Sequence, residues 1–173
     1  MTLANKITIV RILLIPVFVI GLLLQAPVWP VIIFIVSALT DILDGLAARW
    51  KKEKTVLGTF LDPLADKLLL VSSYITLAHL NLLPMWAFVV VFSRDLFIFL
   101  GWSIIFILTK NSEIKPRWLG KITTFVQMIT ILSVLMPLLA PLYKASLILM
   151  LLLTAASTVD YILFGAKKLN TLH

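Results

Sequence analysis

Four aspartates at helical spacing lie inside an otherwise apolar stretch, and their side chains point to metal chemistry. The 8 acidic residues of the chain include these four, so half of its carboxylates fall in this stretch. They form the pattern Asp41-x-x-Asp44-Gly45-x-x-Ala48-Arg49, then eight residues, then Gly58-x-x-x-Asp62-x-x-x-Asp66. Burying an ionised carboxylate at membrane depth is costly unless something neutralises it, so the cluster requires cations.

Each half of the pattern places its carboxylates on one face of a helix, because residues three and four apart lie on the same side. Asp41 and Asp44 share such a stripe with Gly45 and Ala48, and the second half repeats the arrangement. The connection around 50–56 is short, which predicts that the two helices are antiparallel neighbours. All four carboxylates can then converge on one cavity.

A site with oxygen ligands alone favours hard cations, Mg²⁺ or Mn²⁺. Three carboxylates could hold two ions about 3.5–4 Å apart, leaving the fourth for proton transfer. Two alternatives remain open for the aspartates: a structural cluster paired to Arg49 and Lys67, or a path for protons or ions. The small residues Gly45, Ala48 and Gly58 give clearance for a large phosphorylated ligand or permit tight helix packing.

The composition is that of an integral membrane protein with all-α structure. Of its 173 residues, 61% are hydrophobic and 13% charged, whereas soluble domains carry about 25% charged residues. This length predicts a single domain over 1–173. The absence of cysteine excludes disulfides and thiolate chemistry. The N-terminus has no small-residue cleavage site and carries Arg11 within its apolar run, which indicates a retained first helix.

Six apolar runs are long enough to cross a bilayer, which takes about 20 residues each. We predict spans at 6–25, 28–49, 57–79, 84–109, 118–139 and 143–165. The basic residues gather at the ends that a six-helix arrangement places on one side, with Lys144 as the exception. By the positive-inside rule, both termini and the loop of the aspartate pattern face the cytoplasm. The net charge of +7 therefore fits a lipid surface and phosphate substrates, and we expect no nucleic-acid partner.

The aspartate pattern resembles the signature of the CDP-alcohol phosphatidyltransferase family, with every defining position present. The resemblance implies a homodimer of six-helix subunits in the cell or inner membrane, with an active site open to the cytoplasm. It implies that Asp41, Asp44 and Asp62 bind the metals and that Asp66, at the same metal site, is the catalytic base. Candidate contacts for the substrate CDP-diacylglycerol are Gly45, Ala48, Arg49 and Gly58.

Three further passages are similar to the phosphatidylglycerol and cardiolipin branch of that family. They are Asn5-Lys6-Ile7-Thr8 to Arg11, Leu61 to Lys67, and Gly120-Lys121-Ile122-Thr123-Thr124 to Gln127. The implied reaction transfers the phosphatidyl group of CDP-diacylglycerol to a glycerol-type acceptor and releases CMP. Glycerol 3-phosphate is the expected acceptor, giving phosphatidylglycerophosphate.

Two alternatives to this reaction remain. Ser93-Arg94-Asp95, with Trp102 where glycerol-3-phosphate enzymes of the branch typically carry a second arginine, looks closer to cardiolipin synthases that use phosphatidylglycerol as acceptor. The other alternative is a carboxylate-lined cation transporter.

Three basic residues are candidates for binding the acceptor's phosphate: Arg94, Lys121 and Lys67. Arg94 lies within a predicted span, where an unpaired guanidinium is expensive. It binds a phosphate or forms an internal ion pair with Asp95, Asp160 or an aspartate of the pattern. Lys121 binds a phosphate or extends to the membrane interface.

Overall fold

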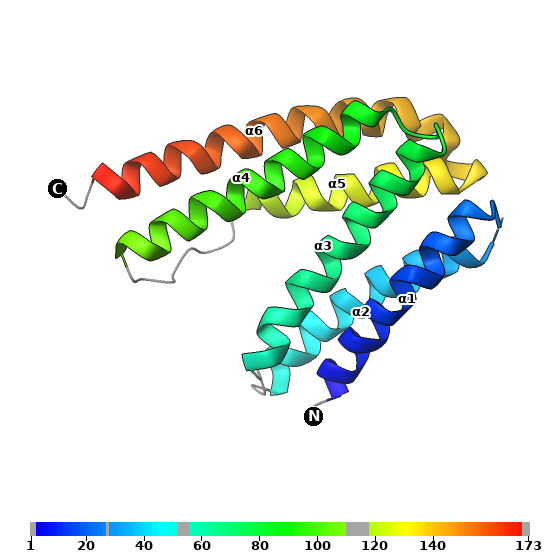
Figure 1. Ribbon diagram of the computed structural model, residues 1–173, viewed down its shortest axis with the longest axis horizontal. Coiled ribbons are helices and arrows are strands. Elements are labelled where there is room, and N and C mark those ends of the chain that lie inside the picture. The colour runs from blue at the N-terminus through cyan, green and yellow to red at the C-terminus, as the bar shows by residue number, and fades with distance from the viewer. Residues whose placement is uncertain (1–2, 27, 52–55, 110–117, 171–173) are drawn as a thin grey trace. The chain divides into compact units, whose positions relative to one another are not determined.

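The computed structural model describes residues 3–26, 28–51, 56–109 and 118–170, and these form helices joined by short turns, with no strand among them. Within the helices, the side chains of 3–7, 41–51, 56–63, 102, 104–109 and 166–170 lie outside the description. The helices are α1 (Leu3–Leu23), α2 (Trp29–Lys51), α3 (Val56–His79), α4 (Met85–Thr109), α5 (Trp118–Leu135), the 3₁₀ helix η1 (Pro137–Leu142) and α6 (Tyr143–Asn170) (Figure 1). The predicted all-α class is confirmed, and a helix lies at each predicted span, although the fifth helix ends earlier than predicted.

The chain divides into two compact units, Met1–Leu83 and Pro84–His173. The first contains α1 to α3, and the second contains α4, α5, η1 and α6. The single functional domain over 1–173 stays a prediction.

In the first unit, α1 packs against both α2 and α3, and consecutive helices run antiparallel. The start of α1, the end of α2 and the start of α3 therefore lie together at one end of this unit (Figure 1). Large apolar side chains fill its interior, including Phe18 and Phe34, whose ring centroids are 6.0 Å apart. The prediction that the two aspartate helices are antiparallel neighbours is confirmed.

Left-handed residues end α1 and α3. Gln25 has φ 52° and Asn81 has φ 58°. The amides around them bond back to the last turns, Ala26 N–H to the Gly21 carbonyl at 3.0 Å and Leu82 N–H to the Leu77 carbonyl at 2.9 Å. This geometry satisfies carbonyls that a helix end leaves without partners. It allows the chain to reverse within a few residues.

The hairpin of α1 and α2 depends on one glycine. A Cβ atom built on Gly21 would lie 2.6 Å from Cζ2 and from Cζ3 of Trp29. Carbon atoms in contact sit about 3.5–4.0 Å apart, so the indole lies where a larger residue would place its side chain. Gly21 is needed here for space rather than for its backbone conformation.

In the second unit, α6 packs against both α4 and α5. It runs parallel to α4 and antiparallel to α5 (Figure 1). The prediction of a fifth span reaching residue 139 is wrong in its end, because α5 stops at Leu135 and η1 begins at Pro137. Met136 is extended, with φ −109° and ψ 114°. A residue before proline avoids the helical conformation, so Pro137 sets the helix end.

The interior of the second unit contains many polar side chains, and its exposed surface carries large apolar ones. The helix α5 buries Thr123, Gln127, Thr130 and Ser133, and α6 buries Ser146, Thr154 and Ser157. Ser133 Oγ lies 3.3 Å from Ser146 Oγ across the two helices. The exposed face of α6 carries Ile148, Leu149, Leu152, Val159, Ile162 and Leu163. Small hydroxyl residues between helices and large apolar residues outside are typical of membrane helices.

Two segments of the described chain are long and apolar enough to cross a membrane, Trp118–Leu135 and Pro137–Gly165. Thr8–Leu23 and Trp29–Thr40 are shorter apolar helical segments. The remaining predicted spans, and the sides on which the termini lie, stay predictions.

Candidate active site

The aspartate pattern lies on two continuous helices. Asp41 and Asp44 belong to α2, and Asp62 and Asp66 belong to α3, on either side of the connection between these helices. The prediction that both halves of the pattern are helical is therefore confirmed for the backbone. Both halves of the pattern are in the parts of α2 and α3 nearest their connection, at the same end of the first unit.

Most side chains of the pattern lie outside the described residues. These are Asp41, Asp44, Gly45, Ala48, Arg49, Gly58 and Asp62. Among the side chains that the structure does describe, no three His, Asp or Glu residues gather as a metal site would require. Convergence of the four carboxylates on metal ions stays a prediction.

Asp66 is the member of the pattern whose side chain is described, and a buried arginine holds it. Nη1 of Arg11, on α1, donates to Oδ1 of Asp66 at 2.9 Å. Nη2 of the same guanidinium donates to Oγ1 of Thr40, on α2, at 3.3 Å. The Arg11 side chain is 2% exposed and that of Asp66 is 25% exposed. One side chain thus links all three helices of the first unit, while Asp66 keeps part of its surface open.

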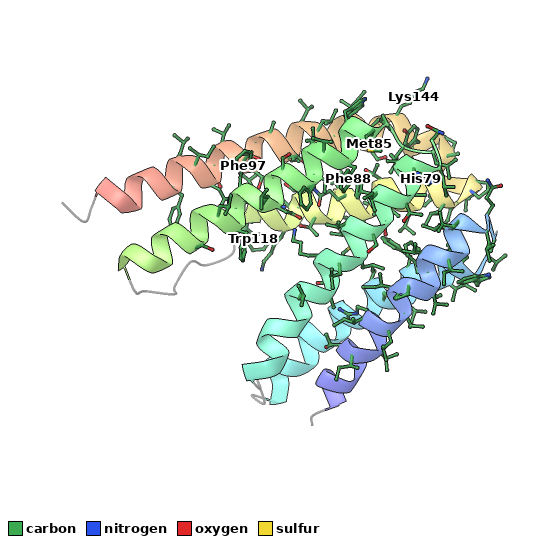
Figure 2. The ribbon with its side chains drawn as sticks, in the orientation of Figure 1. His79, Met85, Phe88, Phe97, Trp118 and Lys144 are labelled. Carbon is green, nitrogen blue, oxygen red and sulfur yellow. The ribbon has the colours of Figure 1, made fainter. Side chains whose placement is uncertain are left out.

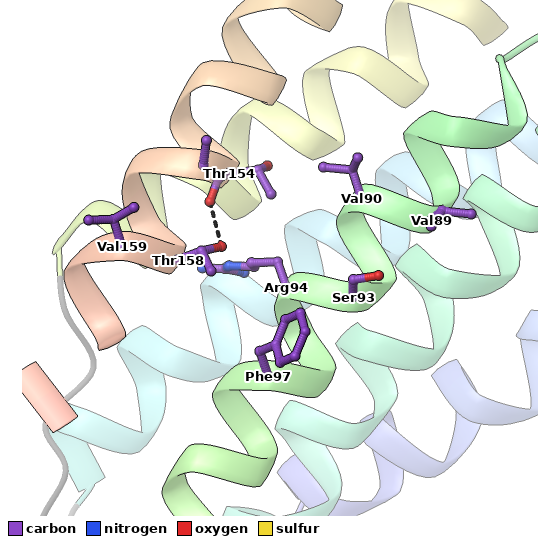
Figure 3. Close-up of a pocket in the computed structure, with 9 residues that line it drawn as sticks. Val89, Val90, Ser93, Arg94, Phe97, Thr154, Thr158 and Val159 are labelled. Carbon is purple, nitrogen blue, oxygen red and sulfur yellow. Dashed lines mark hydrogen bonds between the residues drawn. The ribbon is translucent and has the colours of Figure 1, made fainter. Parts of the chain in front are cut away.

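In the second unit, Arg94 is also a buried arginine that bonds to a carboxylate and a hydroxyl. Its Nη1 donates to Oδ1 of Asp95 at 2.8 Å, and its Nη2 donates to Oγ of Ser157 at 3.0 Å. Arg94 extends from α4 towards α6, beside a pocket of about 380 Å³ that Ser93, Phe97 and Thr154 also line (Figure 3). The ion pair with Asp95 is one of the two possibilities that the sequence left open.

Gly120 gives the Arg94 guanidinium room against α5. A Cβ atom at this position would lie 3.2 Å from Nη2 of Arg94 and 3.3 Å from the hydroxyl oxygen of Tyr161. Contacts this close would require the neighbouring side chains to shift. The glycine that begins the Gly120 to Gln127 passage therefore accommodates Arg94.

The two lysine candidates are more accessible than Arg94. Lys121 is exposed, and its Nζ lies 5.8 Å from the ring centroid of Trp118. Trp118 and Lys144 lie at opposite ends of the hairpin that α5 and α6 form (Figure 2). Lys67, next to Asp66 on α3, is half-buried. The arrangement of Lys121 suits either phosphate binding or anchoring at an interface.

Three hydrogen bonds were not predicted. They join Arg11 to Asp66, Arg11 to Thr40, and Arg94 to Ser157. A usable signal existed for Arg11, since an arginine within an apolar run marks a functional or paired position by default. The two hydroxyl residues gave no such signal, because serine and threonine are common in membrane helices as packing residues.

The model of the CDP-alcohol phosphatidyltransferase family matches residues 1–159. The chain belongs to this family. The match covers the first unit, most of the second and the whole aspartate pattern, so the resemblance inferred from the pattern is confirmed. The family is generally dependent on divalent metal ions.

Curated relatives of this CDP-alcohol phosphatidyltransferase fall into two groups by name. A probable phosphatidylglycerophosphate synthase of Mycobacterium tuberculosis is 36% identical over 170 residues, covering 92% of this chain and 79% of the relative. The CDP-diacylglycerol–glycerol-3-phosphate 3-phosphatidyltransferase of Bacillus subtilis is 36% identical over 150 residues, covering 78% and 76%. A probable CMP-forming cardiolipin synthase of Drosophila melanogaster is 35% identical over 156 residues, covering 76% of this chain and 46% of that protein.

Proposed function

We propose that this chain transfers the phosphatidyl group of CDP-diacylglycerol to glycerol 3-phosphate, forming phosphatidylglycerophosphate and CMP. The family match over residues 1–159, which includes every position of the aspartate pattern, is the observation that carries the proposal. Similarity to relatives with this named activity over most of their own length favours the acceptor. Family membership also favours a transferase over a cation transporter.

Asp41, Asp44 and Asp62 would hold two divalent ions, Mg²⁺ or Mn²⁺. Asp66 would lie at the same metal centre. Carboxylates alone, on two antiparallel helices near their connection, are a donor set that suits hard divalent cations. Bound ions would neutralise the negative charge of the diphosphate and of the departing CMP. Gly45, Ala48, Arg49 and Gly58 would contact CDP-diacylglycerol beside this site.

Asp66 would serve as the general base. It would take the proton from the acceptor hydroxyl as that oxygen bonds to the phosphorus carrying diacylglycerol. The bond from this phosphorus to the oxygen shared with the cytidylyl phosphate then breaks, and that oxygen leaves with CMP. Its partial exposure, 25%, leaves the carboxylate reachable by an acceptor.

Arg94, Lys121 and Lys67 would bind the phosphate of the acceptor. Arg94 is 4% exposed, and within the described part of the chain its Nε has no hydrogen-bond partner. A buried donor without a partner is destabilising, so a phosphate oxygen would complete its hydrogen bonding. Lys121 and Lys67 would add positive charge.

A second candidate acceptor is phosphatidylglycerol, which would make the product cardiolipin. The Ser93-Arg94-Asp95 triplet favours it, as do relatives named cardiolipin synthase in Drosophila melanogaster and Rattus norvegicus. This chain spans about half of those proteins, 46% and 53%, against three quarters or more of the first group. We therefore rank this acceptor second.

The two candidates differ in the mass of the lipid product. Purified protein would be incubated with CDP-diacylglycerol, Mg²⁺ or Mn²⁺, and either glycerol 3-phosphate or phosphatidylglycerol, followed by mass spectrometry of the lipids. We expect phosphatidylglycerophosphate and an equal amount of CMP from the first mixture. Cardiolipin from the second mixture alone would reverse the ranking, and no CMP from either would overturn the proposal.

The proposed setting is the cell or inner membrane, in a homodimer of six-span subunits with both termini and the active site on the cytoplasmic side. The polar interior and apolar exterior of α5 and α6 support burial in lipid. The concentration of basic residues near the predicted cytoplasmic ends supports the orientation.

A further inference from the structure

Arg11, on α1, forms hydrogen bonds to both aspartate helices of the first unit. Its guanidinium donates to Asp66 on α3 at 2.9 Å and to Thr40 on α2 at 3.3 Å. Thr40 directly precedes Asp41, the first residue of the aspartate pattern. Movement of Arg11 would therefore affect the side chain of the candidate base and the residue beside a candidate metal ligand.

Arg11 and Asp66 differ in burial. The Arg11 side chain is 2% exposed, whereas that of Asp66 is 25% exposed. The arginine approaches Asp66 from inside the three-helix unit, and the carboxylate keeps an accessible side. A buried arginine beside a partly exposed carboxylate suits a residue that acts through Asp66.

The chemistry of arginine explains why this residue type fits the position. A guanidinium carries its donors in a rigid planar fork and stays charged, so it can bind acceptors on two helices at once. Lysine offers a compact charge on a flexible stem. A buried charge is tolerated only when paired, so the guanidinium and the carboxylate stabilise each other's ionised forms.

We propose that Arg11 is a positioning residue of the phosphatidyl transfer reaction, holding the Asp66 carboxylate where it accepts the acceptor's proton. Thr40 completes the arrangement by fixing the second arm of the guanidinium on α2. This inference rests on the proposed function, specifically on Asp66 as the base.

The test compares variants of the full-length protein in detergent, with CMP release as the activity and Mn²⁺ affinity as a separate readout. Arg11→Lys keeps the charge and loses the fork. We expect its kcat to fall about 10- to 100-fold, since a misplacement of about 1 Å can cost on the order of 100-fold. Both Michaelis constants and the Mn²⁺ affinity should stay within about twofold, because substrate and metal contacts remain. An unchanged kcat would overturn the inference.

Thr40→Val and Thr40→Ser form a second, milder pair. The valine variant removes the acceptor of Nη2 and should lower kcat about three- to tenfold, in line with loss of one hydrogen bond. Thr40→Ser should recover most of that loss because it keeps the hydroxyl. Ser72→Ala is the control, since the Ser72 hydroxyl donates to Leu68 within α3 itself. Equal losses in Thr40→Val and Ser72→Ala would count against the inference.

A double variant distinguishes positioning from general support of the fold. If Arg11 acts through Asp66, adding Arg11→Lys to Asp66→Asn should cause no further loss of the residual rate. A further loss equal to that of Arg11→Lys alone would overturn the inference and leave Asp66 as the base. Near-normal turnover by Asp66→Asn itself would instead overturn the proposed function of Asp66. If Arg11→Lys does not fold, as judged by size-exclusion chromatography, the comparison of Thr40→Val with Thr40→Ser tests the inference instead.

Discussion

Arg11 and Arg94 are both buried guanidinium groups, and among the described contacts each donates to a carboxylate and to a hydroxyl. Arg11 pairs with Asp66, 55 residues away, whereas Arg94 pairs with its neighbour Asp95 and reaches Ser157 on another helix. Removing one partner of a buried ion pair leaves an uncompensated charge, which destabilises a fold by about 3–5 kcal/mol. Substitutions at these positions therefore call for conservative variants and for separate measurements of folding.

Asp62 and Asp66 lie one helical turn apart on α3, which makes them a matched pair of variants. Asp62→Asn should weaken Mn²⁺ binding and abolish transfer, because it removes a charged metal ligand. Asp66→Asn should keep most of the Mn²⁺ affinity while turnover falls about 10²- to 10⁴-fold, the usual contribution of a general base. Mn²⁺ titration and CMP release measure the two effects. Equal losses of metal affinity in both variants would contradict the division of roles.

Arg94→Lys tests binding of the acceptor phosphate. Losing the charge-assisted contact of Nε with the phosphate should raise the Michaelis constant for glycerol 3-phosphate about tenfold, with a smaller change for CDP-diacylglycerol. Initial rates at varied concentrations of each substrate measure both constants. The same rise for both substrates would indicate a structural role for the ion pair with Asp95.

The turn between α1 and α2 and the interface between α5 and α6 depend on small residues in different ways. Gly21 makes space for the Trp29 ring, which packs where a side chain would otherwise lie. Between α5 and α6, several buried serine and threonine hydroxyls bond to backbone carbonyls, and Thr123 Oγ1 donates to the Leu153 carbonyl at 3.3 Å. In both cases a small side chain lets two helices approach closely.

Gly21→Ala should destabilise the first unit. Inserting a methyl group against the Trp29 ring should lower the free energy of unfolding by about 1–3 kcal/mol, the usual effect of overpacking. Gly101→Ala is the control, because a Cβ atom at Gly101 meets nothing within 4 Å. Thermal unfolding in detergent should show a lower midpoint for Gly21→Ala and an equal or higher midpoint for Gly101→Ala. Equal midpoints for the two variants would contradict the packing argument.

At the scale of the whole molecule, the proposed orientation in the membrane is a prediction from the distribution of charge. The helix α6 runs from Tyr143 to Asn170, which places Lys144 and Lys168 about 36 Å apart at 1.5 Å per residue. The hydrocarbon core of a bilayer is about 30 Å thick, so these two lysines can lie on opposite sides. The positive-inside rule predicts that Lys168 faces the cytoplasm and that Lys144 lies on the opposite side.

The absence of cysteine makes this orientation directly measurable. Lys144→Cys should react with a membrane-impermeant maleimide from outside intact cells or spheroplasts. Lys168→Cys should react only after the membrane is permeabilised. The reverse labelling pattern would invert the proposed orientation, and labelling of both residues from outside would exclude a span between them.

Local properties of the chain explain how much could be predicted from sequence alone. Apolar runs, helical spacing and prolines act over a few residues. The helix bounds, and the helical backbone of the aspartate pattern, could therefore be predicted closely from sequence. The end of α5 was missed because the preference of Met136 for extended backbone before Pro137 outweighed the apolar run.

Contacts between distant residues depended on tertiary structure. Arg11 binds Asp66 and Thr40 because α1 packs against both other helices with that face turned inward. Arg94 likewise reaches Ser157 because Gly120 leaves room beside α5. An arginine in an apolar run must find a partner, and this need is visible in the sequence. Which carboxylate it meets is decided by the rotation and register of packed helices, and those arise only when the whole unit folds.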